Sequence, residues 1–135
     1  MKLLFLYSGR DGQTQKITET MAAQLSGGIL HEIHDIRYFD GQTLNQFDAV
    51  IMGVSVRYGR FQPEFHRLVS TYSGTLNTMN GALFTVSLVA RKPHKCTPEG
   101  NSYTRKLLAT IPWHPQYCQV LPALCAGPDI AGWTG

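Results

Sequence analysis

Three features that would place this chain in a specialised class of protein are missing from its sequence. No apolar run approaches the ~18 residues that a membrane-spanning helix needs. The cysteines, Cys96, Cys118 and Cys125, form no CxxC pair, so they favour free thiols in a reducing compartment over a disulfide framework. The net charge is only +3 and no basic stripe is interleaved with aromatic residues. This pattern argues against a nucleic-acid-binding protein.

What the sequence does contain is a regular alternation of apolar runs and helical patterns. Its 135 residues predict one domain, and a hydrophobic content of 43% suits a folded core. The apolar start runs directly into a glycine-rich turn without a cleavage site, so it predicts a strand and not a signal peptide. The patterns predict strands at 2–7, 29–36, 48–54, 82–89 and 117–124, helices at 13–25, 63–72 and 102–110, and loops at 39–47 and 91–101.

This alternation predicts an α/β fold with an open, parallel, five-stranded sheet and helices on both faces. Ser73 and Gly74 are expected to end the second helix, and a stripe formed by Ile17, Met21 and Leu25 is expected to face the core. In such a sheet, ligands bind beyond the carboxyl ends of the strands. Three predicted loops leave that edge.

The first loop favours a bound phosphate. Small residues let its backbone approach a ligand, and the hydroxyls of Ser8 and Thr14, with the free N–H groups of a helix start, suit an anion. It matches neither a Walker A loop nor a GxGxxG motif. Asp11 is expected to cap the helix. An ordinary capped turn between strand and helix is the alternative. The predicted residues are Ser8, Gly9, Arg10, Asp11, Gly12, Gln13 and Thr14.

The second loop favours contact with a flat ring. An aromatic residue beside a glycine, Tyr58 and Gly59, suits stacking on a ring while the backbone approaches its polar edge. Arg57 suits the electron-rich edge of such a ring, as in a reduced flavin. A loop with a partly buried tyrosine is the alternative. The predicted residues are Ser55, Val56, Arg57, Tyr58 and Gly59.

The third loop is long and basic, which in a compact domain favours a functional role. A rim formed by Arg91, Lys92, Lys95, Arg105 and Lys106 suits a substrate that carries propionates. A solvated charged surface is the alternative. The residues predicted to contact the ligand here are Ser87, Leu88, Val89, Ala90, Arg91 and Lys92.

No metal site is predicted, because His31 and His34 would face opposite sides of a strand. His94 and His114 are expected near the third loop as candidate substrate contacts. His66 is expected at the surface of a helix, and Trp113 in packing. The residues identify no catalytic proton acceptor.

Several of these segments together resemble a known family. They are Arg10–Thr14, Ile51–Gly59 and Val86–Pro93, with Thr97, Pro98 and Asn101–Tyr103, and they are similar to the quinone-dependent protoporphyrinogen IX dehydrogenases, a flavodoxin-like family. The resemblance runs from Met1 to about Leu124. It implies strand order 2-1-3-4-5 and FMN as the cofactor, with its phosphate at Ser8–Thr14 and its isoalloxazine ring between Ser55–Gly59 and Ser87–Lys92.

The resemblance also implies a reaction and a location. Protoporphyrinogen IX would be oxidised to protoporphyrin IX in two-electron steps, with the electrons passed to a membrane quinone. The protein would be cytoplasmic and peripheral on the inner face of the cell inner membrane, and its oligomeric state stays open. A flavodoxin-type electron carrier and an inactive FMN-binding fragment are the alternatives. The basic third loop favours the dehydrogenase, since such carriers tend to be acidic.

The end of the chain departs from the resemblance. Residues 125–135 are small and glycine-rich and lack the basic, aromatic insert and the terminal helix that the family implies. We therefore expect a flavodoxin-like FMN-binding domain at 1–124 and an atypical, truncated tail. Codons allowed for residues 125–132, read in a shifted frame, can spell Arg-x-Pro-x-Tyr-Arg, which suggests a frameshifted product. A missing helix predicts weak stability or self-association and low dehydrogenase activity.

Overall fold

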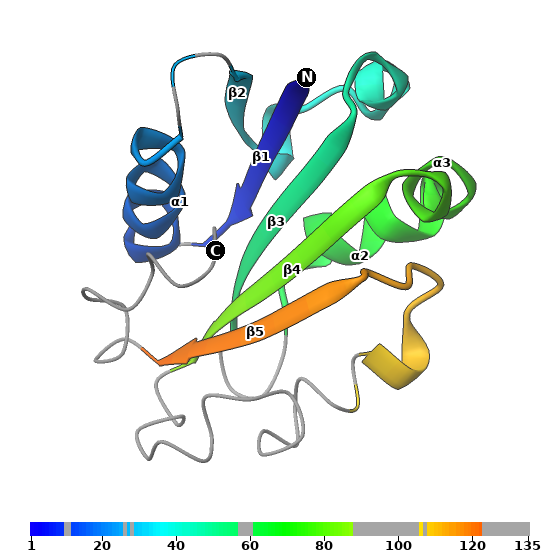
Figure 1. The fold of residues 1–135 in the computed structure, drawn as a ribbon. Coiled ribbons are helices and arrows are strands. Elements are labelled where there is room, and N and C mark those ends of the chain that lie inside the picture. Colours follow the sequence, from blue (N-terminus) through cyan, green and yellow to red (C-terminus); the bar gives the residue numbers. More distant parts are fainter. Residues whose placement is uncertain are drawn as a thin grey trace.

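The computed structural model describes residues 1–9, 12–25, 27, 29–56, 61–87, 106 and 108–122. Its strands form one parallel sheet in the order β2-β1-β3-β4-β5 (Figure 1). This confirms the predicted sheet and its strand order. The strands are β1 Lys2–Ser8, β2 Leu30–Asp35, β3 Ala49–Val56, β4 Asn80–Ser87 and β5 Tyr117–Pro122.

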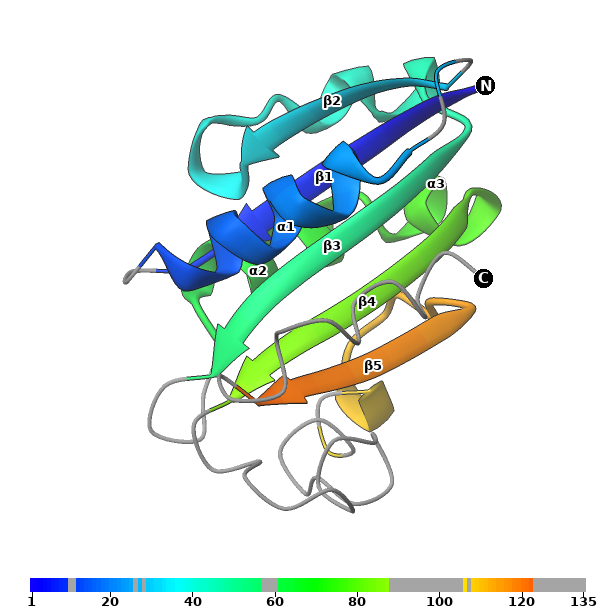
Figure 2. The same ribbon diagram turned by 60° about the vertical axis from the view of Figure 1, so that its left-hand side comes forward.

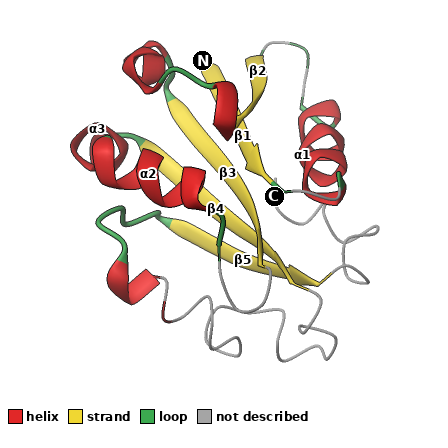
Figure 3. Ribbon diagram, turned by 180° about the vertical axis from the view of Figure 1, so that it is seen from behind, coloured by secondary structure: helices red, strands yellow, loops and turns green. Residues whose placement is uncertain are grey.

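Helices cover both faces of the sheet, as predicted. The helix α1 (Gln13–Ala23) lies on one face, and α2 (Pro63–Thr71) and α3 (Ser73–Thr78) lie on the other (Figures 2 and 3). Pro63 occupies the first turn of α2, where its missing N–H leaves no intrahelical bond unmade. No helix among the described residues is long and apolar enough to cross a membrane.

The central strands β1, β3 and β4 are mostly apolar because both of their faces are covered. Along β1, Leu4 and Leu6 pack into the cluster under α2, whereas Leu3 and Phe5 pack into the cluster under α1. All four side chains are buried. Each buried side chain of this kind stabilises the fold by about 1.5–3 kcal/mol. This two-sided burial explains the continuous apolar runs in the sequence.

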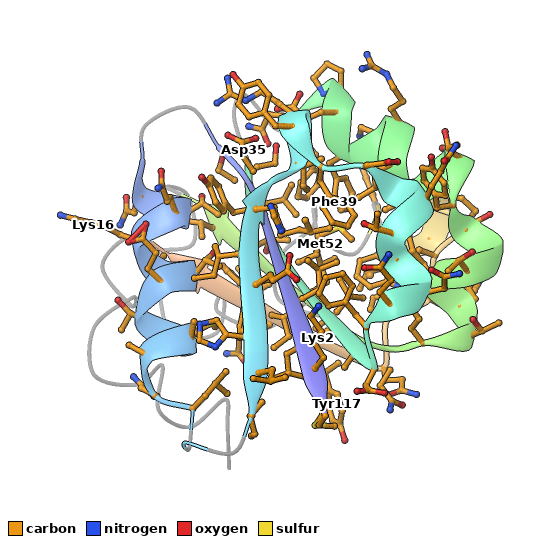
Figure 4. All side chains as sticks on the ribbon, turned by 90° about the horizontal axis from the view of Figure 1, so that it is seen from above. Lys2, Lys16, Asp35, Phe39, Met52 and Tyr117 are labelled. Carbon is orange, nitrogen blue, oxygen red and sulfur yellow. The ribbon has the colours of Figure 1, made fainter. Side chains whose placement is uncertain are left out.

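The larger cluster lies on the α2 face. Figure 4 shows Met52 in the interior there and the partly buried Phe39 packed against the cluster, whereas Lys16 projects from α1 away from the sheet. Trp113, which is 1% exposed, belongs to this cluster and confirms its predicted packing role. On the α1 face, Ile17 and Met21 are buried, so the predicted core stripe is confirmed at these positions.

Two predictions about local structure are incomplete. α2 ends at Thr71, just before Ser73 and Gly74 as expected, but a further helix follows, because α3 begins at Ser73 after a break at Tyr72, whose φ of −115° and ψ of 24° are not helical. The fully buried Leu76 anchors this extra turn in the core.

The predicted loop at 39–47 contains more helix than expected. The 3₁₀ helix η2 (Gly41–Gln46) forms there, and η1 (Ile36–Tyr38) forms just before it, at the end of the strand predicted at 29–36. Aspartate carboxylates cap the N-termini of both helices. Asp35 accepts a hydrogen bond from the N–H of Arg37, and Asp40 accepts one from the N–H of Gln42. The helix predicted at 102–110 is described only at Lys106 and Leu108–Thr110, which are helical. The loop at 91–101 and the tail at 125–135 lie outside the described residues.

Candidate functional site

The carboxyl ends of β1, β3 and β4 lie side by side at one edge of the sheet. In register, Ser8 of β1 lies opposite Val54, and Val56 of β3 lies opposite Ser87 of β4. The strand order reverses between β1 and β3, which places a topological switch point at this edge. The structure therefore brings the starts of the three predicted loops together.

A buried hydroxyl without a partner marks the start of α1. The Thr14 side chain is fully buried, and among the described residues its Oγ1 makes no hydrogen bond. A Cβ atom added at Gly9 would lie 3.0 Å from this oxygen and 3.3 Å from Ser55 Oγ. Both hydroxyl groups therefore lie where a side chain at position 9 would be, and only glycine leaves room for them. Buried hydroxyls nearly always have partners, so this one indicates a place for a ligand.

The N-terminus of α1 suits an anion. Its N-cap is Gly12, with a φ of +81° that favours glycine, and no side chain caps the helix. No acidic residue lies in the first turn, so the N–H groups and the positive end of the helix dipole are available to a negatively charged group. The N-cap position itself belongs to Gly12 and not to Asp11. Asp11 itself lies outside the described residues.

A hydrogen-bonded bridge crosses the ends of β1 and β3. The Ser8 hydroxyl lies 3.2 Å from Gln62 Oε1 and 3.1 Å from Glu64 Oε1, so its single hydrogen is shared between two acceptors. Gln62 Nε2 in turn donates to Ser55 Oγ at 3.0 Å. Gln62 was not among the site residues predicted from the sequence. Its one signal was a polar residue directly before Pro63, which puts it at the N-cap of a helix that begins at the carboxyl edge.

The charges near this edge are largely paired. Burial, followed by the nearby carboxylates of Asp35 and Glu19, raises the pKa of Tyr7, so its phenol stays protonated at neutral pH. Hydrogen bonds to the Asp35 carboxylate raise the pKa of Arg37. A cleft of about 290 Å³ lies between η1, η2 and α2, with Arg37, Glu64 and Arg67 in its lining. Its volume is at the lower limit for small-molecule pockets.

The remaining predicted site residues are placed in part or not at all. Val56 and Ser87 end their strands at the site edge. The prediction that His114 lies near the third loop and contacts the substrate is wrong. Its N–H donates to Asn77 Oδ1, and Gln116 N–H donates to Gly81 O, because the chain has by then returned to the amino edge of the sheet to begin β5. Outside the described residues lie Arg10, Asp11, Arg57, Tyr58, Gly59, Leu88, Val89, Ala90, Arg91, Lys92, His94 and Lys95.

The other histidines take no part in this edge. His31 packs the edge of its ring on Phe5, and His34 bonds to Glu32 at 2.8 Å. His66 is exposed on α2, as predicted. The described residues contain no group of three His, Cys, Asp or Glu side chains that could hold a metal ion.

Comparison with known proteins gives a family match over most of the chain. A flavodoxin domain family matches residues 4–128. The protoporphyrinogen IX dehydrogenase (quinone) of Escherichia coli K12 is 39% identical over 122 residues, which cover 90% of this chain and 67% of that protein. The enzyme of the same name from Leishmania major is 38% identical over 117 residues, which cover 85% of this chain and 51% of that protein.

Solved structures show the same fold. The crystal structure of oxidised flavodoxin 1 from Bacillus cereus has a TM-score of 0.69 and 13% identity, and the match covers 99% of this chain and 95% of that one. A flavodoxin from Pseudomonas aeruginosa has a TM-score of 0.64 and 14% identity, with 98% and 96% covered.

These matches confirm the predicted resemblance and, with it, FMN as the cofactor and an oxidoreductase as the class of enzyme. The buried Thr14 hydroxyl, the bare Gly9 backbone and the open N-terminus of α1 all suit the phosphate of that cofactor. The chain belongs to the flavodoxin domain family and, within it, to the quinone-dependent protoporphyrinogen IX dehydrogenases.

Proposed function

We propose that this protein binds FMN at the carboxyl edge of the sheet and oxidises protoporphyrinogen IX to protoporphyrin IX, with the electrons passed to a membrane quinone. One observation carries the proposal. A fully buried, unpartnered hydroxyl lies at an uncapped helix start, at the switch point of a chain 39% identical to an enzyme of that name. The flavin-binding domain would be residues 1–124.

The described residues have defined tasks in this proposal. Thr14 Oγ1 and the first N–H groups of α1 would donate hydrogen bonds to the phosphate, and Gly9 would let the phosphate approach between Thr14 and Ser55. The rest of the loop at 8–14 would complete this contact. Residues 55–59 and 87–92 would frame the ring. Bound FMN supplies a two-electron acceptor for the substrate.

Basic residues after β4 would hold the substrate by its propionates. Lys106, which is exposed, would join Arg91, Lys92, Lys95 and Arg105 in this role. A positive surface of this kind also suits an anionic membrane leaflet. We propose accordingly that the protein is cytoplasmic and associates peripherally with the inner face of the inner membrane, where a quinone is within reach.

Reconstitution with FMN, followed by an oxidation assay, tests the proposal. The full chain is loaded with FMN and its absorbance spectrum recorded. Protoporphyrinogen IX is then added without oxygen, with and without a quinone, and porphyrin fluorescence is followed. We expect a retained flavin spectrum and a fluorescence gain that continues past one turnover only with quinone present.

Two results would contradict the proposal, each in a different way. Failure to retain FMN would exclude the cofactor site. Retained FMN without any porphyrin formation would exclude the dehydrogenase activity and favour the flavodoxin-type carrier, whose reduced flavin should then pass electrons to a partner protein such as cytochrome c.

A further inference from the structure

A buried glutamine side chain lies across the ends of two strands at the site. Gln62 is only 6% exposed, and its carboxamide contacts Ser8 at the end of β1 and Ser55 near the end of β3. Although Gln62 is the N-cap residue of α2, its side chain makes no capping hydrogen bond. The side chain therefore hydrogen-bonds to the two serines and does not cap its own helix.

The direction of these hydrogen bonds determines what Ser55 can do. Ser55 Oγ accepts from Gln62 Nε2 at 3.0 Å, so the hydrogen of its own hydroxyl must point to another acceptor. Within the described residues no acceptor takes this hydrogen. Ser55 Oγ and Thr14 Oγ1 lie 3.3 Å and 3.0 Å from the position of a Cβ on Gly9. Two hydroxyl donors therefore flank the same stretch of backbone.

The far end of the bridge supports the same direction. The Ser8 hydroxyl donates toward Gln62 Oε1, so this oxygen accepts and the amide nitrogen is left to face Ser55. Glu64 Oε1 lies 3.1 Å from the same Ser8 hydroxyl and is a second acceptor for its hydrogen. Hydrogen bonds that run in one direction polarise each other, which strengthens the last donor in the row.

We propose that Gln62 is a positioning residue that fixes the Ser55 hydroxyl as a hydrogen-bond donor to the phosphate of the flavin, beside Thr14. The inference rests on the proposed FMN site and adds to it a residue that contacts no phosphate itself. A hydrogen bond to a charged acceptor changes affinity by roughly 10- to 100-fold. The loss of Gln62 should therefore weaken FMN more than riboflavin, which has no phosphate.

A double-mutant cycle tests the inference. Flavin fluorescence quenching gives the dissociation constants of FMN and riboflavin for wild type, Gln62→Met, Ser55→Ala and the double variant. Met matches the size of Gln without its polar atoms. We expect each single change to weaken FMN by roughly tenfold and riboflavin by less than about threefold. The double variant should be no weaker than the worse single variant, since both remove the same donor.

Two more variants control for charge and for folding. Gln62→Glu keeps a polar bridge, but its carboxylate accepts from both serines and turns the Ser55 hydrogen away from the site. It should weaken FMN at least as much as Gln62→Met does. Gln46→Glu makes the same charge change at an exposed position in η2 and should leave FMN affinity unchanged. Thermal melts of the apoproteins show whether each variant folds.

Three results would overturn the inference: additive losses in the cycle, equal losses for FMN and riboflavin, or unchanged FMN affinity in Ser55→Ala. The last of these would mean that the amide faces the other way and that Ser55 donates to Gln62. If the wild-type protein bound neither flavin, the proposed function itself would be refuted. Wild-type FMN binding with an unaffected Gln62→Met variant would refute this inference alone.

Discussion

At the scale of single residues, Thr14 carries an unusual combination of burial and lack of a partner. Thr14→Val replaces the hydroxyl with a methyl group of similar size. We expect the apoprotein to be as stable as wild type or more so, because a buried unpaired oxygen is removed. FMN affinity should fall by roughly tenfold or more, because a donor to the phosphate is lost. Urea denaturation and flavin fluorescence titration measure the two effects.

Thr18 supplies a matched control in the same helix. Its side chain is also fully buried, but its hydroxyl donates to Thr14 O at 2.8 Å. Thr18→Val should therefore leave FMN affinity unchanged and give no stabilisation. If Thr14→Val destabilised the apoprotein, or left FMN affinity at the wild-type value, its hydroxyl would have a structural role instead.

Gly53 on β3 leaves room for the ring of Phe84, its partner on the neighbouring strand β4. A Cβ atom there would lie 2.2 Å from the ring of Phe84, which is fully buried. Gly53→Ala should therefore destabilise the protein by about 3 kcal/mol, as overpacking does in a tight core. Urea denaturation measures this change.

Gly74 and Phe84 supply the comparison variants. Nothing lies within 4 Å of a Cβ at Gly74, in α3, so Gly74→Ala should be neutral or slightly stabilising. Combining Gly53→Ala with Phe84→Leu should cost less than the sum of the two single changes, since the smaller side chain relieves the clash. Additive costs would show that the clash with Phe84 is not the cause.

At the scale of elements, the outermost strand β2 is held to β1 in part by charge. Glu32 bonds to Lys2 Nζ at 2.9 Å and to His34 Nε2 at 2.8 Å. These bonds lower the pKa of Glu32 below its usual 4.5. A lowered carboxyl pKa means that the stabilisation is present above the unfolded-state pKa and is lost as pH falls through the folded-state value.

The pH dependence of Glu32→Gln tests this contribution. Wild type should be slightly more stable than the variant at pH 6–7, and the difference should disappear as pH falls through the lowered folded-state pKa of Glu32. Urea midpoints at several pH values measure it. The difference should also shrink in high salt, since both side chains are partly exposed. A difference that grew at low pH would contradict the assigned pairing.

The elements also show what the sequence can and cannot reveal. The strands β1, β3 and β4 were predicted because burial on both faces leaves a continuous apolar run. The start of α3 was missed because Gly74 usually ends a helix, and only the tertiary packing of Leu76 restarts it. Gln62 was missed for a similar reason. Its role depends on Ser8 and Ser55, which are 54 and 7 residues away along the chain.

At the scale of the whole molecule, the proposed phosphate site joins elements that are distant in sequence. Gly9 follows β1, Thr14 lies in α1, Ser55 in β3 and Gln62 at the start of α2. These groups come together only in the folded chain, so the binding site is absent from the unfolded chain. Ligand binding therefore increases the free energy of unfolding. The added stability is about 2.7 kcal/mol at a free ligand concentration of 100 times the dissociation constant.

FMN should therefore raise the melting temperature of the full chain by roughly 5–15 °C at that concentration. Riboflavin at the same concentration should raise it by less, because the contacts that we propose for Gly9, Thr14 and the Ser55 hydroxyl are with the phosphate. Scanning calorimetry with each flavin measures both shifts. In Thr14→Val the FMN shift should shrink toward the riboflavin shift, while in Thr18→Val it should match wild type. An equal shift with both flavins in wild type would place the binding energy in the ring alone and would exclude the carboxyl ends of β1 and β3 as a phosphate site.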